Sequence, residues 1–115
     1  MRRGEIRLVD LEPVRGAEAN KRRPAVIVSN DAANSIATRL QRGVLTVVPL
    51  SSNVHRVFGF QVLMPAAATS LPLDSQAQAE QVRAVAFERI GAQVGLVSEP
   101  LMQAIDEALR LHLAL

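Results

Sequence analysis

The stretch PAVIVSN, residues 24–30, is a short apolar and β-branched run between a proline and two turn-forming polar residues. Such a run is typical of a central β-strand. Three cations, Lys21, Arg22 and Arg23, stand directly before it, and Glu18 lies just upstream. Charge of this density beside a core strand is either a solvated strand end or a site for an anionic ligand.

Three further segments predict strands that pair with this one. Residues 5–11 (EIRLVDL) alternate largely as a half-buried strand does, and Pro13 and Gly16 then open a loop. Residues 44–50 (VLTVVPL) form a second core strand, with a proline near its end where a missing N–H is tolerated. Residues 57–64 (VFGFQVLM) contain an edge strand.

The remaining segments are mixed. Residues 30–43 predict a turn with a short helical piece, and residues 75–87 (SQAQAEQVRAVAF) fit either a helix or two strands. The clearest helix ends the chain, because Ser98 can cap it and Glu99 and Pro100 suit its first turn. One face of this helix carries Leu101, Ile105, Ala108, Leu109 and His112. The pattern therefore predicts one domain, residues 1–115, that is mainly β with a C-terminal helix: a strongly bent antiparallel sheet or partly closed barrel.

Composition excludes several classes of protein. The chain has 115 residues, of which 49% are hydrophobic and 21% charged, as in an ordinary soluble globular domain. It has no cysteine, so it has no disulfide, no thiolate metal site and no Cys nucleophile. Charges interrupt the first residues, which are therefore no signal peptide, and the longest uncharged stretch, residues 57–73, contains two prolines. We expect a cytoplasmic location.

The charges are distributed unevenly along the chain. The net charge is only +2, and 12 of the 13 basic residues are arginine. Residues 1–60 carry 10 bases and 5 acids, whereas residues 61–115 carry 3 bases and 6 acids. A basic half of this kind favours a phosphate-bearing partner such as nucleic acid.

The cationic loop before residue 24 has a specific chemistry. Guanidinium groups match phosphate oxygens with two parallel hydrogen bonds, and Arg23 precedes Pro24, which biases Arg23 toward an extended backbone. Glu18 can either pair with Arg23 or act as a base in a partly desolvated pocket. The plainer interpretation is that all of them are solvated surface charges.

The other candidate residues give weaker signals. Ser51 and Ser52 follow a core strand, where a hydroxyl can bond a phosphate or simply form a turn. Gln81 and Arg83 are two positions apart, so in a strand they would lie on the same side, which is usually just a polar face. His55 and His112 have no carboxylate beside them, and the sequence contains neither a metal-ligand motif nor a glycine-rich phosphate loop. We expect no cofactor, and any phosphodiester chemistry has to run without a metal.

Several motifs taken together resemble those of the MazF/PemK-type toxins, the endoribonucleases of type II toxin–antitoxin pairs. The resemblance covers essentially the whole chain and is most specific over residues 4–31. The matching elements are Gly4-Glu5-Ile6, Val9-Asp10-Leu11, Pro13, Gly16 with Glu18, Arg23-Pro24-Ala25-Val26, Val48-Pro49-Leu50-Ser51-Ser52, and Asp74-Ser75 with Gln81 and Arg83.

This resemblance implies an SH3-like antiparallel β-barrel of the MazF/CcdB type that forms a homodimer. It implies metal-independent cleavage of single-stranded RNA at short specific sequences, with 2′,3′-cyclic phosphate and 5′-hydroxyl ends, and so inhibition of translation and growth. It also implies a small antitoxin whose acidic C-terminal tail covers the RNA groove.

The resemblance also assigns roles to residues. Arg23 holds the charge that builds on the phosphate, Ser51 orients the phosphate or the leaving oxygen, and Glu18 is the candidate base. The residues expected to bind RNA are Arg15, Lys21, Arg22, Ser52, Gln81 and Arg83. Some relatives carry a His before the loop glutamate and an Arg-x-Asp before the later glutamine, where this sequence has Ala17, Gln78 and Glu80.

Two other functions remain open from the sequence. One is a gyrase-poisoning toxin of the same fold, although that family acts through an aromatic-containing helix end, and this helix ends LRLHLAL (109–115) in a chain without Trp. The other is a catalytically inactive, RNA-binding relative, which retention of both Arg23 and Ser51 disfavours.

Overall fold

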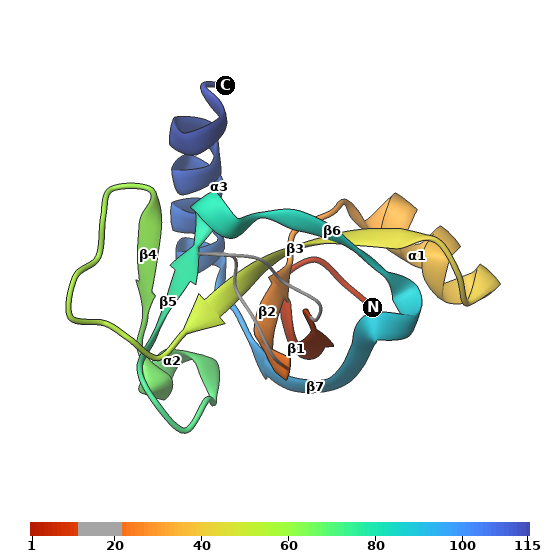
Figure 1. Ribbon diagram of the computed structural model, residues 1–115, viewed down its shortest axis with the longest axis horizontal. Helices are drawn as coiled ribbons and strands as arrows, with labels where there is room; N and C mark the ends of the chain where they lie inside the picture. The colour runs from red at the N-terminus through yellow and green to blue at the C-terminus, as the bar shows by residue number, and fades with distance from the viewer. Residues whose placement is uncertain (12–21) are drawn as a thin grey trace.

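A computed structural model of the chain describes residues 1–11 and 22–115 (Figure 1). Its elements in order are β1 (Glu5–Asp10), β2 (Arg22–Ile27), α1 (Asp31–Leu40), β3 (Val44–Ser51), β4 (Gln61–Met64), α2 (Ala66–Thr69), β5 (Ser75–Gln78), the 3-10 turn η1 (Ala79–Gln81), β6 (Arg83–Ala86), the 3-10 turn η2 (Phe87–Arg89), β7 (Ile90–Leu96) and α3 (Glu99–Leu113).

The sheet is organised around β3. β2 pairs antiparallel with one edge of β3, in a register that sets Ala25 opposite Pro49. The segment 75–86 runs antiparallel along β3 as β5 and β6, with η1 between them. This segment, which fits a helix or two strands by sequence, is therefore two strands. The full order of neighbours is β4-β5-β3-β2-β1-β7, with β6 on β3.

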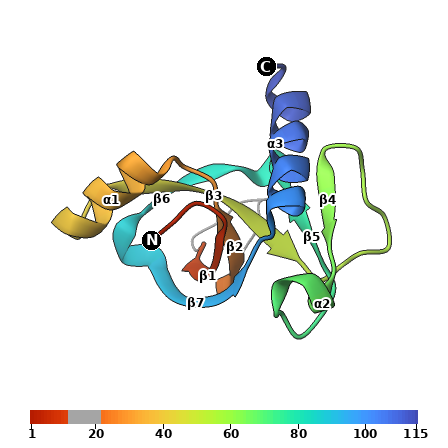
Figure 2. The ribbon, with the colours of Figure 1, turned by 180° about the vertical axis from the view of Figure 1, so that it is seen from behind.

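The predicted fold class is confirmed: the described residues form a seven-stranded sheet with a C-terminal helix. The sheet is bent rather than closed, because among the described strands β4 and β7, at the two ends of the order, do not pair with each other. α1 lies at one end of the long axis of the molecule and β4 at the other, and α3 projects to one side, close to β4 (Figures 1 and 2).

Both faces of the central strands are buried, which is why these strands read as continuous apolar runs. Alternate residues point to opposite faces of a sheet, so Val26 and Val48 enter one core cluster while Ile27 and Val47 enter another. The first cluster includes Ile105 of α3, and the second includes Ala37 of α1.

α1 is a full ten-residue helix where the sequence predicted a turn and a short helical piece. Its start is fixed by Asn30, whose Oδ1 accepts a hydrogen bond from the Ala33 N–H at 2.8 Å. Asn34 is fully buried, and its Nδ2 donates to the Ser29 carbonyl at 2.8 Å. A hydrogen bond from the Arg3 N–H lowers the pKa of Asp31 in the first turn.

The sequence did not predict β7, which pairs with β1. Two glycines inside the strand, Gly91 and Gly95, weaken its signal. Gly95 is needed for packing, because a Cβ there would lie 2.5 Å from the Thr69 carbonyl oxygen of α2. The sequence also missed α2, and of the predicted strand at residues 57–64 only Gln61–Met64 is a strand.

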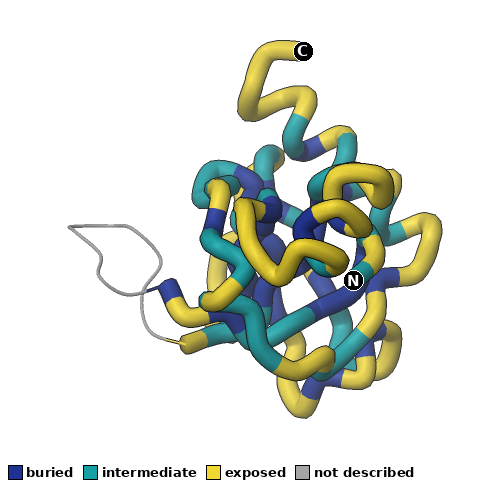
Figure 3. The backbone as a smooth tube through the Cα atoms, turned by 90° about the vertical axis from the view of Figure 1, so that its right-hand side faces the viewer, coloured by how far each residue is buried: buried dark blue, intermediate teal, exposed yellow. Residues whose placement is uncertain are grey.

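The predicted C-terminal helix is confirmed as α3. Ser98 occupies its N-cap position, but no side-chain capping hydrogen bond forms there. Ile105 and Ala108 are buried, whereas His112, which the sequence placed on the same face, is exposed. The last turns extend beyond the body of the protein (Figure 3). No helix within residues 1–11 and 22–115 has the length and hydropathy needed to cross a bilayer.

The close approach of α2 to β7 gives a test of the fold. We predict that Gly95→Ala lowers the free energy of unfolding by about 1–3 kcal/mol, because the new methyl group meets backbone that cannot move aside. Urea denaturation measures this change. Gly59→Ala is the matched control, since its Cβ would lie 3.6 Å from a Leu111 methyl carbon, an ordinary contact. Equal unfolding midpoints for the two variants would contradict the packing described here.

Candidate functional site

A groove of about 300 Å³ lies where β2 begins and β3 ends. Three segments form it: the start of β2, the end of β3 with the next residue, and the connection from α2 to β5. Its lining residues are Arg22, Arg23, Pro24, Leu50, Ser51, Ser52, Leu71, Pro72, Leu73 and Ser75.

The register of β2 and β3 brings the two most specific candidates to this groove. Ala25 lies opposite Pro49, and the strands run in opposite directions. Two residues further toward the groove on each strand stand Arg23 and Ser51. Both residues are half-buried and both line the groove. Residues 28 positions apart in the sequence are therefore placed together by strand pairing alone.

The two arginines of the groove have different surroundings. Arg23 is half-buried and lies opposite Val9 of β1. Arg22 is exposed, and its guanidinium lies over β7, where a Cβ on Gly91 would come within 2.8 Å of Nη2. Gly91 thus leaves room for the Arg22 side chain, which explains the second glycine in β7.

The hydroxyls of the groove come from the end of β3. Ser51 Oγ accepts a hydrogen bond from the Asn53 N–H at 3.2 Å, which turns the chain after the strand. The Ser51 hydroxyl can still donate its own hydrogen to a ligand oxygen. Ser52 follows it and is exposed. The sequence left open whether Ser51 forms a turn or binds a ligand. Its hydroxyl can do both at once, because it accepts one hydrogen bond and can donate another.

One wall of the groove is apolar, and sequence reasoning missed it. Leu71, Pro72 and Leu73 supply this wall. Asp74 fixes their connection, because its Oδ1 accepts the Ala66 N–H at the start of α2 at 2.8 Å. The Asp74-Ser75 motif was the sequence signal that could have indicated this wall. Asp74 holds the wall in place, and Ser75 lines the groove.

The predicted site residues fall into three groups. Arg22, Arg23, Ser51 and Ser52 are brought together in the groove. Gln81 and Arg83 lie on η1 and β6, outside the groove lining; Arg83 Nη1 donates to the Leu11 carbonyl at 3.4 Å. Their role in RNA binding stays a prediction. Arg15, Glu18 and Lys21 lie outside the described residues.

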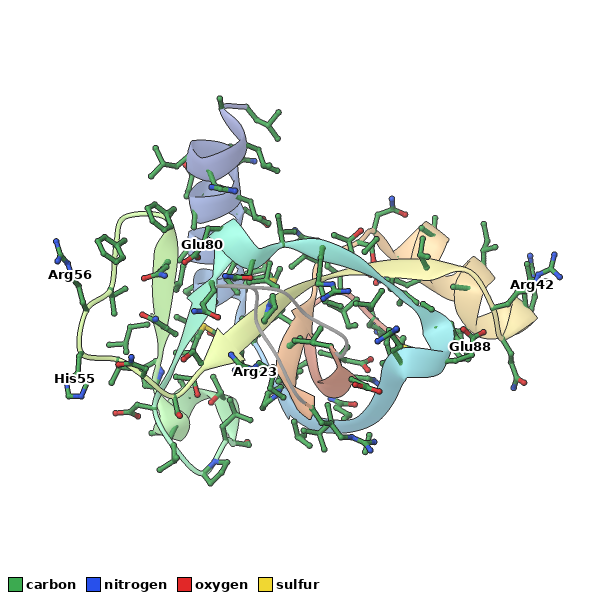
Figure 4. All side chains as sticks on the ribbon, viewed as in Figure 1. Arg23, Arg42, His55, Arg56, Glu80 and Glu88 are labelled. Atoms are coloured by element: carbon green, nitrogen blue, oxygen red, sulfur yellow. The ribbon has the colours of Figure 1, made fainter. Side chains whose placement is uncertain are left out.

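The groove can hold an oxyanion. The Arg23 guanidinium and two hydroxyls supply hydrogen-bond donors, and the apolar wall suits the attached organic group. Figure 4 shows Arg23 near the groove end of β3, whereas Arg42 and Glu88 lie at the far end of the molecule. Within the described ranges, no three His, Asp or Glu side chains gather as a metal site would require.

Comparisons with known proteins agree on one family. A family model described as PemK-like, MazF-like toxin of type II toxin–antitoxin system matches residues 2–113. Endoribonuclease MazF9 of Mycobacterium tuberculosis is 58% identical over 115 residues, which is 100% of this chain and 98% of that protein.

Solved structures agree with this fold. MazF (Form-I) from Deinococcus radiodurans superimposes with a TM-score of 0.83 at 21% identity, covering 100% of this chain and 97% of that one. An endoribonuclease in complex with its cognate antitoxin, from a mycobacterial species, superimposes with a TM-score of 0.77 at 25% identity, covering 100% and 96%.

Proposed function

The chain belongs to the PemK-like, MazF-like toxins of type II toxin–antitoxin systems, and we propose that it cuts single-stranded RNA at the groove lined by Arg23 and Ser51. The observation that carries this proposal is that strand pairing places an arginine and a hydroxyl in one groove with an apolar wall. Its 58% identical relative, matched over the whole chain, is named an endoribonuclease.

The reaction is an internal transesterification. The ribose 2′-oxygen attacks the adjacent phosphorus, the O2′–P bond forms, and the P–O5′ bond breaks. The products are a 2′,3′-cyclic phosphate and a 5′-hydroxyl. The 2′-proton passes to a base, and the leaving 5′-oxygen gains a proton. No metal is required, because the nucleophile is part of the substrate and the protein stabilises the charge that develops.

Each groove residue has a role in this step. Negative charge builds on the non-bridging phosphate oxygens, and the Arg23 guanidinium stabilises it. Arginine stays protonated throughout, so Arg23 is an electrostatic group rather than a proton donor. The Ser51 hydroxyl orients the phosphate. Glu18, outside the described residues, is the proposed base, and Arg22 with Ser52 binds the neighbouring backbone.

The two other functions have less support. The exposed end of α3 carries leucines and a histidine but no aromatic residue of the kind that the gyrase-poisoning family uses. The presence of both Arg23 and Ser51 in one groove disfavours an inactive RNA-binding relative. We propose single-stranded RNA as the substrate, with mRNA, tRNA and rRNA all open as the target, and the cytoplasm as the place of action.

A second copy of the chain fits the projecting end of α3. Leu111 and Leu115 are 63% and 84% exposed there. The β3–β4 loop reaches this surface, because the Phe60 ring lies 6.2 Å from the His112 ring and stacks on Phe58 at 5.5 Å. Phe58 is exposed rather than in the core, and a homodimer would bury this apolar surface.

An antitoxin tail fits the groove by charge and shape. The groove combines two arginines with an apolar wall, so a segment that carries both acidic and apolar residues is complementary to it. A tail seated there would occupy the position of the RNA phosphate and block cleavage by competition.

The first prediction concerns cleavage. In EDTA, the purified protein is expected to cut a long single-stranded RNA at discrete sites whose fragments end in 2′,3′-cyclic phosphate. Arg23→Ala should slow cleavage by about 10²–10³-fold, because one charge-stabilising group is lost. Gel mapping and mass spectrometry of the ends measure both effects.

Arg42→Ala is the matched control, since this arginine lies at the far end of the molecule (Figure 4). It should cut at the same sites and at the rate of the unaltered protein. A folded Arg23→Ala variant that cuts as fast as Arg42→Ala would remove Arg23 from the mechanism. Intact RNA with the unaltered protein would overturn the nuclease proposal.

The second prediction concerns the dimer. Sedimentation equilibrium should give twice the 12.4 kDa chain mass. A Leu111→Arg, Leu115→Arg double variant should be monomeric, because two charges enter the apolar contact. Ile36→Arg on α1, also an exposed apolar position, should remain dimeric. A monomeric unaltered protein, or a dimeric double variant, would exclude this surface.

The third prediction concerns the antitoxin. The acidic tail of the antitoxin, as a synthetic peptide, should displace a fluorescent RNA oligonucleotide from the protein. Replacing both Arg22 and Arg23 with Gln should weaken peptide binding at least tenfold in low salt, since two charge-assisted contacts are lost. Simultaneous binding of peptide and oligonucleotide would show that the tail lies elsewhere.

A further inference from the structure

Three buried side-chain oxygen atoms on β5 and η1 have no hydrogen-bond partner among residues 1–11 and 22–115. They are Gln76 Oε1, Gln78 Oε1 and Glu80 Oε1, which we call the acceptor row. Buried polar atoms in folded proteins are nearly always paired. Three such acceptors within five residues are therefore unusual and indicate that a donor is supplied from outside the described residues, as a bound ligand would supply it.

The acceptor row begins directly opposite Ser51. Ser51 and Gln76 are register partners in the β3–β5 pair, so their side chains lie on the same face of the sheet. Ala77, the next residue, faces the first core cluster instead. Gln78 returns to the face of Ser51, roughly 7 Å along the strand. The row thus leads away from the position proposed for the reacting phosphate.

A hydrogen-bond chain fixes one end of the row. Gln61 is the register partner of Gln78, and its Nε2 donates to Glu80 Oε2 at 2.5 Å. Its own Oε1 accepts the Phe58 N–H at 3.0 Å. One oxygen of the Glu80 carboxylate is therefore held in place, and the other is left unpaired. The position of this acceptor is set before any ligand arrives.

The chemistry of the row selects its ligand. A glutamine amide can present either its oxygen or its nitrogen after a rotation, whereas a carboxylate can only accept. Among nucleic-acid groups, an exocyclic amino group matches such acceptors: glutamine pairs with adenine N6, and glutamate accepts from cytosine N4. Uracil has no exocyclic amino group and offers only its N3–H, which lies between two carbonyl oxygens.

We propose that the acceptor row reads one base of the RNA, next to the cut phosphate, through the exocyclic amino group of that base. This inference rests on the proposed function, because it assumes that RNA lies in the groove. The three oxygens are buried, but their side chains border the surface: Gln78 and Glu80 are half-buried, and Leu63, the register partner of Gln76, is exposed, so side-chain rotation brings these oxygens to a base. Gln76, only 6% exposed, forms the enclosed end.

The test separates binding from cleavage. RNA oligonucleotides that contain a mapped cut site, with a 2′-deoxy sugar at the cut nucleotide, cannot be cleaved and report affinity by fluorescence anisotropy. At each neighbouring position, the base is replaced by its analogue without the amino group: purine riboside for adenosine, inosine for guanosine, or uridine for cytidine. At one position this change should weaken binding by about 10- to 100-fold.

Glu80→Gln should remove most of that discrimination, because the fixed acceptor becomes in part a donor. Glu88→Gln is the matched control: it lies at the far end of the molecule (Figure 4) and should discriminate as the unaltered protein does. Thermal melting checks that both variants fold. A folded Glu80→Gln variant that keeps the full amino-group dependence would overturn the proposal.

Cleavage of the matching all-ribose oligonucleotides distinguishes this proposal from the proposed function. If the unaltered protein cuts RNA but no amino-group deletion changes its affinity, only the base-reading inference fails. If the unaltered protein cuts no RNA, the proposed function fails and the inference fails with it.

Discussion

The antiparallel pairing of β2 with β3 is the constraint on which the other features depend. Its register sets Ala25 opposite Pro49, so both strands reach the same end of the sheet and bring Arg23 and Ser51 to one groove. β5 then pairs with the end of β3, which carries the acceptor row to the side of Ser51. The register of β3 with its two neighbours therefore positions both the groove and the acceptor row. Paired strands hold side chains more precisely than loops do.

The groove continues a face of the sheet that is elsewhere part of the core. Ile27 and Val47 belong to the second core cluster, and the residues on the same face toward the strand ends are Arg23 and Ser51. On each strand the face changes from apolar to polar between one residue and the next residue on that face, a distance of roughly 7 Å. Core packing therefore positions the charged groups directly, without an intervening flexible linker.

Three surfaces of the molecule use three different interactions. The groove offers positive charge, which suits a phosphate backbone and gives binding that weakens with salt. The acceptor row offers hydrogen-bond acceptors, which suit a base edge and give sequence preference. The end of α3 offers exposed leucines, which suit a second copy. A net charge of only +2 is consistent with a short cationic track whose specificity comes from contacts to bases.

By itself, the sequence determined the central strands, the C-terminal helix and the two family motifs that contain Arg23 and Ser51, because apolar runs and short motifs are local signals. It did not show β7, whose glycines make room for the Thr69 carbonyl and the Arg22 guanidinium. Only tertiary structure decided these contacts, the apolar wall of the groove and the unpaired oxygens of the acceptor row, because each depends on atoms brought together from distant segments.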